Sequence, residues 1–134
     1  DNVEEGEGTY LNTREWKYAT YFNRIKQAVA TQWDPNTSLR VRDPDGRMYA
    51  YRDRVTIVGV TLNDRGALKD VYVSKSCGVD FLDRSAIEAF QRAQPFDHPP
   101  KGIVDNHGEI KFTFGFYLEV GSSGLRLFRS PGAP

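Results

Sequence analysis

One stretch of the chain, from Glu109 to Val120, alternates strictly between apolar residues and polar or small ones. A period of two over this length is typical of a β-strand with one buried face and one face in water. The apolar face consists of Ile110, Phe112, Phe114, Phe116, Leu118 and Val120. Because it is the last regular element that the pattern predicts, we expect it at a sheet edge, where unpaired N–H and C=O groups can receive another chain.

The composition narrows the class of protein. The 134 residues suffice for one domain with a modest core, and 18 basic against 18 acidic side chains give no net charge. A nucleic-acid partner is therefore not expected, since its binding requires a basic surplus. Residues 1–11 are interpreted as an acidic linker and 121–134 as a flexible tail, so we expect a folded module from a longer protein.

Two helices are predicted from apolar stripes with helical spacing. The first begins near Asn12 and ends before Pro35, and its stripe consists of Tyr18, Phe22, Ile25, Val29 and Trp33. The second follows Asp80, and its stripe consists of Leu82, Ala86, Ala89, Phe90 and Ala93. The following Pro95 ends the second helix, and Phe96 is expected to close one end of the core.

Residues 55–62 form a β-branched run with apolar side chains on both faces, which favours a central strand. A turn at 63–66 leads into a second strand, 67–76, in which the alternation slips between Leu68 and Val71 and predicts a bulge. With the strand at 109–120, the expected fold is α+β: a three-stranded antiparallel sheet of order 2-1-3, with both helices packed on one face.

The insert at 34–54 is predicted to be a small hairpin or a loop, because Asp43-Pro-Asp-Gly46 is a strong turn sequence. It carries five arginines, namely Arg40, Arg42, Arg47, Arg52 and Arg54. We expect them to lie in water and to pair with the aspartates of the same segment. The alternative is a second binding surface for an anionic partner, formed by Arg40, Arg42 and Arg47.

No set of residues with the spacing of a catalytic or phosphate-binding motif is present. The chain has a single cysteine, Cys77, and two histidines, His98 and His107, whose spacing is a weak metal signal. Asp80 and Asp83 are explained by their position at the start of a helix. We therefore expect that the protein is not an enzyme and that it binds no cofactor or metal. The alternative is a small hydrolase that uses Cys77 or His98.

The second half of the chain resembles the TonB C-terminal domain family. The match consists of the hairpin Leu62–Ser76 with its Val-Tyr-Val strand, the helix within 78–94, the Ala-Gln-Pro-Phe-Asp-His-Pro-Pro loop at 93–100 and the strand Ile110–Leu118. The first helix departs from the family pattern and is more similar to that of TolA domains, since it runs into Trp33 and Pro35. The insert looks like those of TonB-family proteins from myxobacteria.

The resemblance implies that 12–120 is a periplasmic domain of a protein anchored in the inner membrane, which inner-membrane proton-driven motor proteins energise through its N-terminal part. It further implies that an outer-membrane receptor or envelope protein donates a peptide that adds to the last strand. The residues predicted to bind this partner are Glu109, Lys111, Phe112, Thr113, Phe114, Gly115, Tyr117 and Glu119. The alternatives are an envelope or motility-complex scaffold that binds through the Arg-rich insert, and a weak homodimer through the same edge strand.

Overall fold

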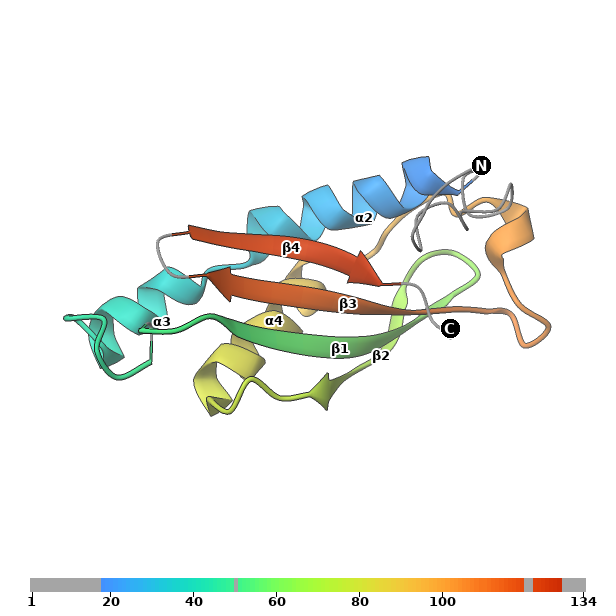
Figure 1. The fold of residues 1–134 in the computed structure, drawn as a ribbon. Coiled ribbons are helices and arrows are strands. Elements are labelled where there is room, and N and C mark those ends of the chain that lie inside the picture. Colours follow the sequence, from blue (N-terminus) through green and yellow to red (C-terminus); the bar gives the residue numbers. More distant parts are fainter. Residues whose placement is uncertain (1–17, 50, 120–121, 129–134) are drawn as a thin grey trace, which may run out of the picture.

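The structure is a computed structural model that describes residues 18–49, 51–119 and 122–128. Its elements, in chain order, are helix α2 (Ala19–Gln32), helix α3 (Pro35–Arg42), strand β1 (Arg54–Asn63), strand β2 (Leu68–Lys75), helix α4 (Asp80–Ala93), the 3₁₀ turn η1 (Lys101–Ile103), strand β3 (Glu109–Glu119) and strand β4 (Ser122–Phe128). Figure 1 shows α2 and α4 behind one face of the sheet, and α3 at one end of it. The predicted start of the first helix near Asn12 lies outside the described residues.

The sheet has the order β2-β1-β3-β4, and all its neighbouring strands are antiparallel. The predicted α+β fold and the order 2-1-3 are therefore confirmed for the first three strands. The predicted bulge in β2 is also confirmed, because Thr61 opposes Asp70 whereas Leu62 opposes Leu68. Lys69 is thus the extra residue of the second strand.

The expectation that β3 forms the sheet edge is wrong, because β4 pairs with it along Thr113–Glu119. Strand β4 lies within the stretch predicted to be a flexible tail, so that prediction fails for Ser122–Phe128. The physical reason is that β3 would otherwise leave a row of backbone groups without partners. Strand β4 lies antiparallel to β3, where its main chain can bind these groups.

The core lies between the sheet and the two long helices, and this confirms the predicted packing on one face. The phenyl ring of Phe90, on α4, stands at its centre and is fully buried. Its ring centroid lies 5.2 Å from that of Phe114 and 5.8 Å from that of Phe96, both in edge-to-face contact. The buried residues around it come from α2 (Tyr21, Phe22, Ile25 and Val29), from β1 (Val58, Val60 and Leu62) and from β3 (Ile110, Phe112 and Phe116).

The loop after α4 closes one end of this core, as the sequence predicts for Phe96. The backbone N–H of Phe96 donates to the carbonyl oxygen of Gly66, at 2.8 Å, and the hydroxyl of Tyr21 donates to the carbonyl oxygen of Phe96, at 2.5 Å. Gly66 has a φ of 85° in the turn between β1 and β2. The β1–β2 turn, the proline loop and α2 are therefore tied together at one point.

The insert differs from the prediction, because its first part is a helix and not a strand or a loop. Asp34 begins α3 by accepting the N–H of Thr37, at 3.2 Å, and Pro35 occupies the first helical turn, where a missing N–H does no harm. The predicted turn follows, with the N–H of Gly46 bonded to the carbonyl oxygen of Asp43, at 3.0 Å. The same proline thus ends the first helix and starts the next.

Candidate functional site

The residues predicted to bind a partner all lie on β3, and the sheet divides them into two groups. The side chains of Phe112 and Phe114 belong to the core and are 2% and 0% exposed. They can contribute only their backbone groups to a partner. The register sets Lys111, Thr113 and Tyr117 on the opposite face, away from the helices, since they oppose Thr61, Gly59 and Val55 of β1.

Glu109, at the start of β3, ties this strand to β2 across β1. Its carboxylate binds the ammonium group of Lys69, and the Nζ of Lys111 lies 3.6 Å from its other oxygen. The hydrogen bond from Lys69 holds the pKa of Glu109 below its usual range. Glu109 is therefore already part of an ion-pair network on the sheet.

The outer edge of β3 is the central feature of the site, and β4 occupies most of it. The pairing runs from Thr113 opposite Phe128 to Glu119 opposite Ser122. Residues Glu109–Phe112 of β3 precede this paired segment. Helix α2 also contacts β4, so the added strand is held on one side by β3 and is touched by a helix.

A shallow groove of about 320 Å³ lies near the end of β3, next to the insert. It is lined by Asp53, Arg54, Val55, Tyr117 and Glu119. On the same open face of the sheet, the ring of Tyr72 lies over Gly59, because a Cβ at residue 59 would be 2.4 Å from the Tyr72 Cζ. The open face of the sheet therefore presents Tyr117 on β3 and, beyond β1, Tyr72 on β2.

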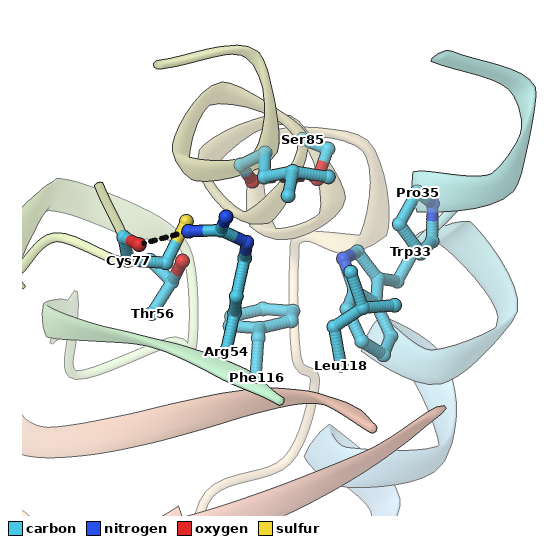
Figure 2. Close-up of a pocket in the computed structure, with 9 residues that line it drawn as sticks. Trp33, Pro35, Arg54, Thr56, Cys77, Ser85, Phe116 and Leu118 are labelled. Atoms are coloured by element: carbon cyan, nitrogen blue, oxygen red, sulfur yellow. Dashed lines mark hydrogen bonds between the residues drawn. The ribbon is translucent and has the colours of Figure 1, made fainter. Parts of the chain in front are cut away.

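A second pocket lies on the helix side of the sheet and surrounds Arg54 (Figure 2). Its volume is about 10 Å³, which is room for about one water molecule. The Arg54 guanidinium donates from Nη1 to the carbonyl oxygen of Cys77, at 3.0 Å, and from Nε to that of Tyr49, at 2.7 Å. Arg54 therefore fastens the insert to the end of β2.

The residues considered for chemistry are not brought together. The thiol of Cys77 is half-buried, and burial raises its pKa, which is the opposite of what an activated nucleophile needs. His98 and His107 lie in exposed loops. Within residues 18–49, 51–119 and 122–128, no group of three His, Cys, Asp or Glu side chains is placed to hold a metal ion.

Asp83 forms a buried hydrogen-bond network that the sequence does not reveal. Its carboxylate accepts the hydroxyl of Thr56, at 2.8 Å, the N–H of Cys77, at 3.0 Å, and the hydroxyl of Ser76. Burial by itself would raise the pKa of Asp83, but these hydrogen bonds offset it, so the pKa lies below its usual range. The network joins the first turn of α4 to the ends of β1 and β2.

We expect Asp83→Asn to lower the free energy of unfolding at pH 7 by about 1–3 kcal/mol, since an amide cannot accept all three hydrogen bonds. Because the folded-state pKa of Asp83 is depressed, its contribution is present at neutral pH and is lost as the pH falls below about 4. The difference between wild type and variant should therefore shrink on acidification. Urea unfolding at several pH values tests this, with the exposed Asp70→Asn as control; a difference that does not change with pH would contradict it.

The arginines of the insert were predicted to pair with its aspartates, and within the described residues only a weaker effect is seen, that of the Arg40 charge on the pKa of Asp34. The described ion pairs involve Lys69, Lys111 and Arg92, and none involves an arginine between 40 and 54. The carboxylate of Asp43 is buried and instead accepts the backbone N–H groups of Arg47, at 2.9 Å, and Tyr49, at 2.7 Å. Arg40, Arg42 and Arg47 are all exposed.

The described residues form a small α+β domain with an antiparallel sheet and the two long helices on one face. Residues 18–114 match the family model described as TonB C terminal, so the chain belongs to the TonB C-terminal family. It is a TonB-like energy-transducing domain. A search of the curated proteins gave no match.

Two solved structures of one TonB C-terminal domain support the fold assignment. The chain is similar to a Helicobacter pylori TonB C-terminal domain, with 18% identity and a TM-score of 0.53 over 76% of this chain and 96% of that one. A longer fragment of the same domain gives 17% identity and a TM-score of 0.50 over 80% and 90% of the two chains. The C-terminal domain of HasB matches with 23% identity and a TM-score of 0.42, over 83% and 72%. None of the helices that the structure describes is long and apolar enough to cross a membrane.

Proposed function

We propose that this domain works in the periplasm as a force-transducing adaptor, which binds a peptide of an outer-membrane partner by strand addition to β3. The observation that carries the proposal is the pairing of β4 with β3 from Thr113 to Glu119. A short strand already lies antiparallel to β3 at the position where a partner would add. This supports β3 as an edge whose backbone geometry accepts such a strand.

The partner strand takes the place of β4 in this proposal. Main-chain hydrogen bonds to β3 supply most of the affinity, because Phe112 and Phe114 are buried and cannot contact the partner. Lys111, Thr113 and Tyr117, on the open face of the sheet, adjust specificity. Strand β3 is held in the sheet on its other side by β1, which pairs with it from Arg54 opposite Leu118 to Asn63 opposite Glu109.

The exchange of β4 for a partner strand also sets the affinity. Only the fraction of molecules in which β4 has left β3 can bind, so the apparent affinity is reduced by that fraction. The domain therefore binds weakly to strands that make few contacts and responds to partners whose strand pairs better than β4. Force that the proton-driven motor proteins generate in the inner membrane is then transmitted through the rest of the anchored protein and this domain to the bound partner.

The test is an amide-shift titration of the isotope-labelled domain with synthetic peptides copied from the periplasmic segments of outer-membrane receptors of the source organism. We expect shifts along Glu109–Glu119 together with loss of the β3–β4 pairing. Shifts that cluster elsewhere would show that the strand-addition site is wrong. Sedimentation at several concentrations distinguishes this from self-association, because a homodimer through the same edge would change its mass with concentration.

A further inference from the structure

A second exposed surface lies at the end of the sheet, on α3 and the loop that follows it (Figure 1). We call it the arginine surface and define it by Arg40, Val41, Arg42, Arg47, Met48, Tyr51 and Arg52. All seven residues are exposed. The side chains of Val41, Met48 and Tyr51 are 76%, 61% and 57% exposed. In the described part of the chain, Tyr72 is the one other large apolar residue whose side chain is exposed.

The backbone beneath the arginine surface is fixed by internal contacts. Leu39 packs in a small second core with Val79, Phe81 and Leu82, and the ring of Tyr49 stands edge-to-face on Phe81 at 5.2 Å. The carboxylate of Asp43 binds the N–H of Met48, at 3.0 Å, in addition to those of its two neighbours. The exposed arginines and apolar side chains are therefore presented from a defined scaffold, on which Arg42 also packs against Phe81.

The charge on this surface is not neutralised within the described residues. None of its arginines forms an ion pair there; the Arg42 guanidinium lies over the Phe81 ring, at 4.9 Å, and that of Arg52 over Tyr51, at 5.9 Å. Two of the nearby aspartates serve other purposes, because Asp34 caps α3 and Asp43 holds the loop. Arg40 lies near Asp34, whose pKa is held below its usual range chiefly by hydrogen bonds from Thr37 and in smaller part by the Arg40 charge. Exposed guanidinium groups that form no ion pair within the described residues are nevertheless suited to carboxylates from another molecule.

We propose that the arginine surface docks an acidic protein segment that also carries apolar side chains, as an interaction separate from strand addition to β3. Carboxylates of the segment pair with Arg40, Arg42, Arg47 and Arg52, while its apolar side chains lie against Val41, Met48 and Tyr51. Arginine and exposed aromatic or methionine side chains are the residue types enriched at protein–protein interfaces.

The net charge favours a protein segment over a lipid surface. Residues 34–54 contain five arginines and four aspartates, a net charge of +1. Adsorption to anionic lipid relies on a cluster of about 4–8 basic residues and their summed field. Pairing with carboxylates depends on the position of each guanidinium, so it tolerates aspartates nearby.

The test uses a fluorescein-labelled peptide of repeated Glu-Glu-Leu units, with a Gln-Gln-Leu peptide as control. We expect the acidic peptide to shift the amides of residues 40–52 and the Gln peptide to leave them unchanged. The double variant Arg40→Glu/Arg47→Glu should weaken binding by about tenfold or more. The matched control Arg65→Glu/Lys101→Glu, which reverses two exposed charges away from the insert, should stay within about twofold.

Three outcomes overturn the proposal. The first is that the acidic peptide shifts no amide of residues 40–52. The second is that both double variants lose binding equally. The third is that vesicles of phosphatidylcholine and phosphatidylglycerol bind through the same arginines while the peptide does not bind. Circular dichroism checks that both variants are folded. Receptor peptides should still shift β3 in Arg40→Glu/Arg47→Glu, so that a failure here and a failure of strand addition are told apart.

Discussion

Deletion of residues 121–134 is expected to raise the affinity of the domain for β3-binding receptor peptides by roughly ten- to a hundredfold. In the proposed function, β4 competes with the partner for β3 from Thr113 to Glu119, at a high effective concentration because β4 starts at Ser122, soon after β3 ends at Glu119 in the sequence. Without β4, the edge is available in every molecule. Fluorescence anisotropy with labelled receptor peptides measures the change.

Two controls separate competition from damage to the fold. Replacing residues 122–128 by a Gly/Ser segment of equal length should give the same gain, because it keeps the tail but removes its strand-forming residues. A synthetic peptide copying Ser122–Phe128 should bind the truncated domain and compete with the receptor peptides. Thermal unfolding shows whether loss of the contact between α2 and β4 weakens the domain. Unchanged affinity in a folded truncation would contradict the competition.

The largest loss of stability is expected for Gly66→Ala, about 3 kcal/mol or more. Gly66 has a φ of 85°, which is unfavourable for alanine, and a Cβ there would lie 1.9 Å from the carbonyl oxygen of Phe96. The clash involves backbone, so the loop carrying Phe96 must move. Its movement breaks the hydrogen bonds from the Phe96 N–H to Gly66 and from the Tyr21 hydroxyl to Phe96.

Gly46→Ala is the matched control for this prediction. Gly46 also has a positive φ, 72°, but no atom within 4 Å of the position of its missing Cβ. It should therefore show only the backbone strain, about 1 kcal/mol. Chemical denaturation of both variants gives the comparison. Equal losses would mean that the contact between Gly66 and the Phe96 carbonyl does not stabilise the fold.

The sheet and its core could be predicted because their side chains carry strong periodic signals. The alternation of Ile110, Phe112, Phe114 and Phe116 is an unbroken period of two, and the slip after Leu68 indicates a bulge that the structure contains. Phe96 could be placed because prolines on either side fix its loop. Each of these signals is local in the sequence and consistent with the global fold.

Strand β4 and helix α3 could not be predicted, because neither has a long periodic pattern of apolar side chains. Residues 122–128 begin with Ser-Ser-Gly, and their apolar alternation is limited to Leu125 and Leu127 on either side of Arg126, followed by Phe128. What places β4 is pairing of main-chain groups with β3, and such pairing leaves little trace in residue type. Helix α3 buries one long apolar side chain, Leu39, so its helical stripe is too short to detect, and Pro35 indicates an end as readily as a beginning.

In the candidate site too, features carried by side-chain patterns could be predicted and features that depend on backbone hydrogen bonds could not. The sequence predicts β3 as the strand that a partner binds, and this stays a prediction; it did not predict that β4 already pairs with β3 from Thr113 to Glu119. The ion pairs expected between the arginines of the insert and its aspartates are absent from the described residues, because Asp43 binds backbone N–H groups instead. Both errors arise from backbone groups, whose demand for partners must be satisfied wherever the chain buries them.

The most direct test of strand addition to β3 is to lock β4 in place. Thr113 and Phe128 are register partners at the far end of β4, so Thr113→Cys/Phe128→Cys in a Cys77→Ser background can join the two strands by a disulfide. We predict that the oxidised protein fails to bind receptor peptides and that reduction restores both binding and amide shifts along β3. Equal binding by the oxidised and reduced proteins would show that partners do not use the β3 edge.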